Sequence, residues 1–174
     1  MSSIGSINSL SQKYDNIIEL SDKAYLVKHN KKFGVVYADG TVAIPVEGTE
    51  FKHTNSIVII TDCINGTTYV FSTTCNRYFR LPDMYRLIKD TNSIAILREI
   101  RTSSGNPKTV IFNTNTMDEI LEPSVVRNLD FDSSEKYIAT FEIFNGGYKI
   151  DDVVYAISNN LNLIVISKNE ITAW

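Results

Sequence analysis

The sequence predicts an all-β chain of four antiparallel β-meander repeats, arranged either as a propeller-like ring or as a rolled sheet or sandwich. Three observations lead to this prediction: an internal repeat, short apolar runs rich in β-branched and aromatic residues, and turn residues between the runs. The 174 residues are enough to bury a core of their own. We therefore expect one folded domain.

The internal repeat is clearest in the middle of the chain. Residues 54–60 read TNSIVII, and residues 91–97, displaced by 37, read TNSIAIL. Three of the four prolines, Pro45, Pro82 and Pro123, follow the last apolar run of successive units, 37 and then 41 residues apart. Because proline has no backbone N–H to donate, we expect these three residues at strand ends or at exposed sheet edges.

The elements are assigned in order along the chain. Residues 1–13 are expected to form a flexible N-terminal arm, and residues 14–170 a single β-repeat domain. Its units are expected at about 14–45, 46–82, 83–123 and 124–170. Each unit has a weak first apolar run and three stronger ones. The four runs of each unit are expected at 16–20, 23–27, 33–37 and 41–45; at 49–52, 54–60, 68–71 and 78–82; at 84–89, 91–97, 109–112 and 119–123; and at 125–131, 136–141, 152–156 and 163–166.

The turns between these runs carry their own signals. Asp39-Gly40 and Asn65-Gly66 are favoured hairpin dipeptides, because both of their residues adopt positive φ at little cost. Helical periodicity is absent elsewhere, and 83–90 is the one place where a short helical turn would fit.

The first unit resembles a WG repeat. The resemblance rests on five segments: YDNI at 14–17, AYLVK at 24–28, KFGVV at 32–36, DGT at 39–41 and AIP at 43–45. It implies an all-β repeat protein with an interaction role, commonly of bacterial or mobile-element origin, and no catalytic residue to carry over.

The chain also departs from that family. Phe33 stands where the name-giving tryptophan is usual, and the later units keep the strand rhythm and the proline but lose the aromatic–glycine pair. Gly34 has a physical reason of its own, since a glycine in a strand allows a bulge or the close approach of another backbone.

Residues that usually carry enzyme chemistry are few. Cys63 and Cys75 are the two cysteines, and neither lies in a CxxC or a nucleophile motif. His29 and His53 are the two histidines, and we expect them on the surface, at a hairpin tip and beside a strand start. We therefore predict no enzyme activity, no cofactor and no metal site.

One segment is a candidate binding surface. Residues 77–86, RYFRLPDMYR, interleave three arginines with three aromatic residues. Arginine and tyrosine are enriched at binding hot spots, and they also suit stacking on single-stranded nucleic acid. The predicted binding residues are Arg77, Tyr78, Arg80, Tyr85 and Arg86. The alternative is that Phe79 and Leu81 point inward and the arginines are simply solvated.

Charge and hydropathy restrict the partner and the location. The net charge of −3 disfavours nucleic acid, because phosphate binding depends on positive surface. Acidic residues gather in 118–152, which offers either an acidic face for a basic partner or a set of solvated loops. No run approaches the roughly 20 apolar residues of a membrane span, and residues 1–14 do not resemble a signal peptide. We therefore expect a cytoplasmic protein without membrane contact.

These observations favour a non-enzymatic interaction module with a protein as its partner. A sharper hypothesis, based on chain size and on the Ile/Asn/Lys-rich composition, is a phage or mobile-element protein that binds and blocks a host defence complex. The alternative is a small-molecule or nucleotide binder, with or without hydrolytic activity, whose site lies at the centre of the β units.

Overall fold

The structure is a computed structural model that describes residues 4–54, 56–90, 93–100, 107–131, 137–145, 148–157 and 163–170, with side chains described only between 9 and 123. These residues form one helix and fifteen strands. The elements are α1 (Ile4–Lys13), β1 (Asn16–Glu19), β2 (Ala24–His29), β3 (Lys32–Tyr37), β4 (Val42–Gly48), β5 (Glu50–His53), β6 (Ile57–Asp62), β7 (Thr67–Ser72), β8 (Arg77–Leu81), β9 (Tyr85–Asp90), β10 (Ile94–Glu99), β11 (Lys108–Asn113), β12 (Glu119–Phe131), β13 (Tyr137–Asn145), β14 (Tyr148–Ile157) and β15 (Leu163–Glu170).

The strands form antiparallel meanders, which confirms the predicted fold class. The first unit is the sheet β1-β2-β3-β4 and the second is β5-β6-β7-β8. Strands β9 to β15 are hydrogen-bonded in one series, because β12 belongs to two units. Its N-terminal part pairs with β11 and its C-terminal part pairs with β13. We call β9–β12 the third unit and β12–β15 the fourth.

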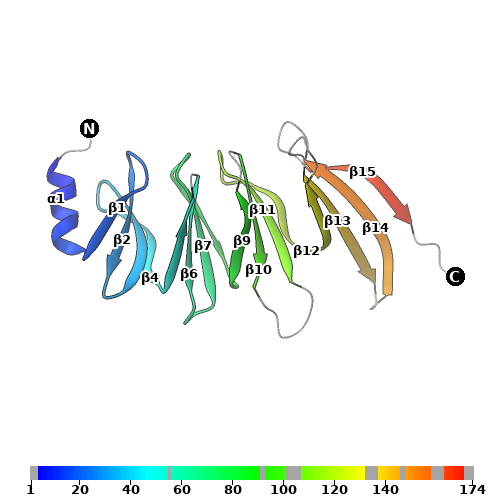
Figure 1. The fold of residues 1–174 in the computed structure, drawn as a ribbon, viewed down its shortest axis with the longest axis horizontal. Helices are drawn as coiled ribbons and strands as arrows, with labels where there is room; N and C mark the ends of the chain where they lie inside the picture. Colours follow the sequence, from blue (N-terminus) through cyan, green and yellow to red (C-terminus); the bar gives the residue numbers. More distant parts are fainter. Residues whose placement is uncertain are drawn as a thin grey trace.

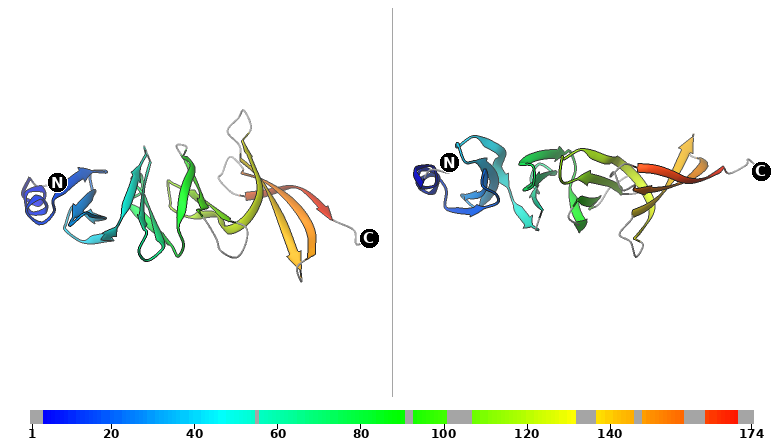
Figure 2. Two further views of the ribbon diagram at one scale, coloured as in Figure 1. Left: turned by 60° about the horizontal axis from the view of Figure 1, so that its bottom comes forward. Right: turned by 90° about the horizontal axis from the view of Figure 1, so that it is seen from above.

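The units follow one another along the long axis of the molecule (Figure 1). Helix α1 lies at one end of this row and β15 at the other, and two further views show the same arrangement (Figure 2). The described strands of the first and last units do not pair with each other. The described units therefore form an open row and not a closed ring.

Burial explains why the middle strands are continuously apolar. All six residues of β6 are buried, because the second unit is covered on both faces. Ile57 and Ile59 pack in a core shared with the third unit, whereas Val58 and Ile60 pack in a core shared with the first. The alternation of side chains along the strand thus joins three units through one segment.

Polar contacts between neighbouring units recur at equivalent turns. The Tyr37 hydroxyl of the first unit donates a hydrogen bond to the Asn76 carbonyl of the second, at 3.1 Å. One unit further on, the Ser72 hydroxyl donates to the Thr114 carbonyl. The Asp90 carboxylate accepts hydrogen bonds from the hydroxyls of Ser56, at 2.5 Å, and Thr54.

The three repeated prolines were expected at strand ends or at exposed sheet edges, and two of them are found there. Pro82 follows the end of β8, and Pro45 is exposed on β4, the edge strand of the first sheet, whereas Pro123 lies within β12. The pairing register shifts beside both Pro45 and Pro123: on β4 from Ile44 to Gly48, and on β12 between Leu121 and Ser124. A bulge leaves a residue outside the hydrogen-bond ladder, so the missing N–H costs no ladder bond there.

The N-terminal segment also differs from the prediction, because residues 4–13 form α1 where a flexible arm was expected. Leu10 is 6% exposed and packs in one cluster with Tyr14, Tyr25, Val27 and Val36. The helix therefore covers the outer face of the first unit. Residues 83–90, where a helical turn seemed to fit, instead contribute β9.

The predicted turns are present. Of the two dipeptides, only the glycines have positive φ, +92° at Gly40 and +70° at Gly66, whereas Asp39 and Asn65 do not. Asn30 and Lys31 both have positive φ at the tip of the β2–β3 hairpin. The Asp62 carboxylate accepts hydrogen bonds from the backbone N–H groups of residues 64 and 65, which holds the pKa of that carboxyl below its usual range and fixes the β6–β7 turn.

Candidate functional site

The predicted arginine–aromatic cluster is divided among three places. Arg77, Tyr78 and Arg80 are exposed on β8, the outer strand at one edge of the second unit. They do not share one face of that strand, because successive side chains alternate. The Arg77 guanidinium donates to the Thr116 carbonyl of the third unit at 3.3 Å. Burial, with a smaller effect of the charge of Tyr78, raises the pKa of Tyr37 in the first unit.

Tyr85 is part of the core, which corrects its assignment as a binding residue. Only 2% of its surface is exposed, and it packs in the cluster between the second and third units. Burial raises the pKa of Tyr85 to about 12, and the charges of Glu99, Asp83 and Glu119 add to the effect. Tyr85 also lines the pocket between the second and third units, but only a small part of its surface is open there.

Arg86 lies on β9, away from the other two arginines. It lines a pocket together with Glu50 and Lys52 of β5, and β5 is the edge of the second unit opposite β8. The five predicted residues therefore do not form one surface. Phe79 and Leu81 do point inward, as the alternative interpretation expected: Leu81 is buried, and the Phe79 ring contacts the Phe112 ring at 5.0 Å.

A different surface brings apolar and charged side chains together in pockets. We call it the first-strand face, because it is built around β1, β5 and β9, the first strands of the first three units. Two pockets open on it, one between the first and second units and one between the second and third. Phe51 of β5 lines both of them, so the two pockets are neighbours.

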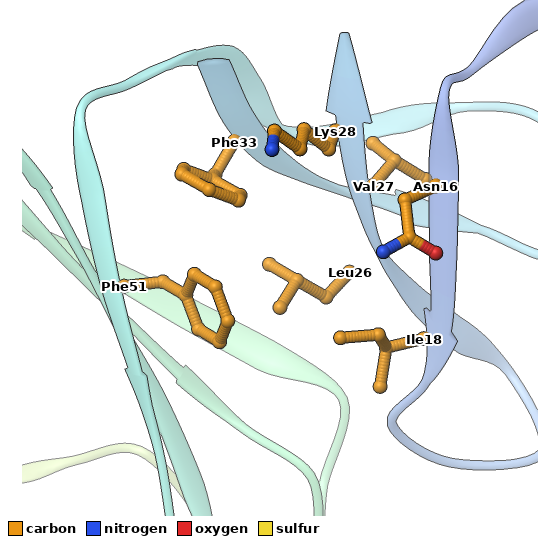
Figure 3. Close-up of a pocket in the computed structure, with 7 residues that line it drawn as sticks. All are labelled: Asn16, Ile18, Leu26, Val27, Lys28, Phe33 and Phe51. Atoms are coloured by element: carbon orange, nitrogen blue, oxygen red, sulfur yellow. The ribbon is translucent and has the colours of Figure 1, made fainter. Parts of the chain in front are cut away.

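The pocket between the first and second units is an apolar slot with a polar rim (Figure 3). It has a volume of about 180 Å³. The lining residues are Asn16, Ile18, Leu26, Val27, Lys28, Phe33 and Phe51. The ring centres of Phe33 and Phe51 lie 4.8 Å apart, with the ring planes inclined by 56°. Leu26 lies between Phe51 and Ile18.

The polar groups of this slot are hydrogen-bond donors. The Lys28 ammonium lies 5.6 Å from the centre of the Phe33 ring. The attraction between this cation and the ring favours a position of the ammonium at the rim of the slot. The Asn16 side-chain oxygen accepts a hydrogen bond from the Ile17 backbone N–H at 2.9 Å. That bond turns the Asn16 amide nitrogen toward the pocket, as Figure 3 shows.

The pocket between the second and third units is wider and more charged. It has a volume of about 260 Å³ and is lined by Glu50, Phe51, Lys52, Ile59, Thr61, Met84, Tyr85, Arg86, Leu87 and Ile100. Together the two pockets contain three cationic side chains and one carboxylate, in a chain with a net charge of −3. Among the described residues, none of Lys28, Lys52 and Arg86 has a carboxylate within 4.0 Å.

Sequence reasoning missed this surface. Lys28 belongs to a basic hairpin tip that reads as solvated, and Phe51 lies in the weakest run of its unit. The pocket forms only when β1, β2, β3 and β5 come together across two units. The nearest signal in the sequence is a large aromatic residue within a short strand whose other residues are charged.

The remaining candidate residues do not assemble into a site. His29 is exposed and lies 3.9 Å from the Asp15 carboxylate, and His53 is exposed on β5. Cys63 is an exposed free thiol and Cys75 a partly buried one. Within the described ranges, no three His, Cys, Asp or Glu side chains are grouped to hold a metal ion. Most of the acidic stretch 118–152 lies beyond the side chains that are described.

Comparison with known proteins adds a likeness in structure. No family model matches the chain, so the resemblance to WG repeats stays a prediction. No curated protein matches it either. Among solved structures, it is similar to the N-terminal domain of Nup159, with a TM-score of 0.35 and 9% sequence identity over 88% of this chain and 47% of that one. The chain thus spans about half the length of that domain. In the described part of the chain, no helix is long and apolar enough to cross a membrane.

Proposed function

We propose that the chain is a non-enzymatic protein-interaction module that holds a segment of its partner on the first-strand face. The observation that supports this most directly is the pair of neighbouring pockets that share Phe51. Each is a hollow between successive units, so a segment that runs along the row would meet one after the other.

Exposed apolar side chains occur on all three strands of this face. Ile18 on β1 and Phe51 on β5 are each 38% exposed, and Ile88 on β9 is 40% exposed. Apolar area of this kind contributes roughly 25 cal/mol per Å² when a partner removes it from water. Large apolar anchors near the centre of a contact supply most of the binding energy of an interface.

Pocket size favours a protein over a small molecule as the ligand. Sites for cofactors and drug-sized molecules usually measure roughly 300–1,000 Å³. The two pockets here measure about 180 and 260 Å³, which suits single side chains of a bound segment. The alternative of a nucleotide or small-molecule binder is therefore less well supported.

The test is site-specific photo-crosslinking with the full chain. A benzophenone amino acid replaces Phe51 in one variant and Tyr78, which is 45% exposed on the opposite edge of the second unit, in the control. We expect adducts with a distinct protein from position 51 and none from position 78. Excess unlabelled wild-type protein should compete these adducts away, and excess Lys28→Glu protein should not. Adducts from position 78 alone would refute the proposal. They would indicate that the partner binds the surface that contains Arg77 and Arg80.

The biological setting is a separate part of the proposal. That the partner is a host defence complex, and the chain a phage or mobile-element inhibitor, is supported by size and composition and not by the site. The check is whether the gene lies among phage or mobile-element genes, and whether its expression lowers resistance of a defended host to infection. A gene among housekeeping genes, with no effect on infection, would contradict it.

A further inference from the structure

We infer that the pocket between the first and second units recognises an apolar side chain that carries a carboxylate beside it, presented by the bound segment of a protein partner. This inference rests on the proposed function and specifies the chemistry that one of its pockets selects. It follows from three properties of the pocket: its shape, the kind of polar groups on its rim, and the lack, among the described residues, of a carboxylate within 4.0 Å of its Lys28 ammonium.

The shape accepts one side chain. Phe33 and Phe51 form one wall, and Leu26 lies between them and Ile18 (Figure 3). The volume of about 180 Å³ is too small for a drug-sized ligand and is open to solvent on the first-strand face. An aromatic or long aliphatic side chain would contact both phenylalanine rings at once, in the offset or tilted geometry that aromatic groups prefer.

The rim selects the polar group beside that side chain. An ammonium has three donors and no acceptor, so Lys28 can only donate. The Asn16 oxygen is already engaged by a backbone N–H, which leaves the amide nitrogen as the group that faces the pocket. A ligand group placed against these two residues must therefore accept hydrogen bonds, and a backbone or side-chain N–H there would have no partner.

Charge narrows the choice of acceptor to an anion. Among the described residues, no carboxylate lies within 4.0 Å of the Lys28 ammonium, so an incoming carboxylate would not have to replace an internal ion pair. Lys28 is also partly buried, which reduces the screening of its charge by water. Hydrogen bonds between an ionised donor and an ionised acceptor are about twice as strong as neutral ones.

Two kinds of segment present this chemistry. One is a chain terminus, where the α-carboxylate follows the last apolar side chain. The other is an internal segment in which Asp or Glu precedes an apolar residue. Both place a carboxylate next to an apolar group, and the probes of the experiment separate them.

The experiment is a titration of the full chain, followed by the methyl NMR signals of Ile18 and Leu26. The probes are N-acetylphenylalanine, which represents a chain terminus, N-acetyl-Asp-Phe-amide, which represents an internal segment, and N-acetyl-Asn-Phe-amide, which has the same shape without charge. For ligands of this size we expect dissociation constants of about 1 mM. At least one anionic probe should bind about fivefold or more tightly than the neutral one, as a charge-assisted hydrogen bond predicts.

Two variants identify the group responsible. Lys28→Met removes the charge and keeps an unbranched side chain that is one atom shorter. It should bring the dissociation constants of the anionic and neutral probes to about the same value. Lys23→Met is the matched control, because Lys23 is an exposed lysine just before β2 that lines neither pocket, and it should keep the preference. The backbone amide spectrum of each variant reports whether it folds as the wild type does.

The outcomes are distinct. Equal affinity for the charged and neutral probes, or shifts at neither methyl group, would overturn the inference. If the probes fail while crosslinking from position 51 still identifies a partner, the interaction function stands and this ligand chemistry is wrong. If both experiments fail, the first-strand face is not a binding surface.

Discussion

Replacing Gly34 with alanine tests the packing of the first unit. Gly34 lies in β3 where the pairing of β4 shifts, since Val35 pairs with Ile44 and Phe33 pairs with Gly48. A Cβ atom at Gly34 would lie 2.6 Å from the Ile44 carbonyl oxygen and 2.7 Å from the Val46 Cα. Separations under 3.0 Å essentially never occur for real Cβ atoms. Strand β4 must therefore move away from β3 if the alanine is to be accommodated.

The size of the effect follows from which atoms are in the way. Both are backbone atoms of a paired strand, so neither can rotate aside as a flexible side chain would. Overpacking of a well-packed site costs about 1–3 kcal/mol, and we expect the upper part of that range, about 2–3 kcal/mol. For a chain of this length such a loss lowers Tm by about 4–12 °C.

The assay is urea unfolding followed by far-ultraviolet circular dichroism, together with amide hydrogen exchange of β3 and β4. Gly66→Asn is the control, because no atom lies within 4 Å of its added Cβ and asparagine tolerates the positive φ of that position. We expect the control to stay within about 0.5 kcal/mol of the wild type. A Gly34→Ala protein as stable as the wild type, with unchanged exchange in β4, would refute the assigned close approach.

Three further predictions concern the core between the second and third units. Phe112→Ala removes a fully buried ring and should cost about 3–5 kcal/mol in urea unfolding, whereas Ile88→Ala, at an exposed position, should cost less than about 0.5 kcal/mol. Asp90→Ala removes the acceptor of two hydroxyl groups of the second unit and should cost about 1–3 kcal/mol, against no measurable change for the exposed Asp22→Ala. The third concerns pH. The pKa of Tyr85 is about 12 in the folded chain and 10.0 in the unfolded chain. The stability that the neutral hydroxyl contributes is therefore complete below pH 10 and is lost as the pH rises toward 12. In that window the free energy of unfolding should fall by up to about 1.4 kcal/mol per pH unit, and Tyr85→Phe should make the slope shallower; an unchanged slope would contradict the burial of the hydroxyl.

The strands could be predicted from the sequence because each has a local signal. The run 57–60 is apolar throughout, which is typical of a strand covered on both faces, and the structure places it in the centre of the row. The Asn65-Gly66 turn follows directly from its two residues. The register shifts beside Pro45 and Pro123 could not be predicted, because a proline also fits a bulge and only the pairing of the neighbouring strand shows one.

The helix and the candidate site were not predictable in the same way. Helix α1 has only three apolar residues among ten, and its stability depends on Leu10 docking against strands further along the chain. The binding residues were sought in one continuous segment, 77–86. The structure instead distributes that segment over two edges and a core, and it joins Lys28 with Phe51 through the stacking of two sheets. Contacts between units depend on the rotation and spacing of neighbouring sheets, and no local sequence pattern predicts these.

The strand β12, which belongs to two units, has a mechanical consequence. The two ends of the row face away from each other, so a force applied through them would load the units in series (Figure 1). The first and second units each have four strands of their own and can come apart separately, whereas the third and fourth are joined through β12 and should yield together. A single-molecule stretching record would then contain two short extensions and one about twice as long, since each released residue adds up to about 3.6 Å.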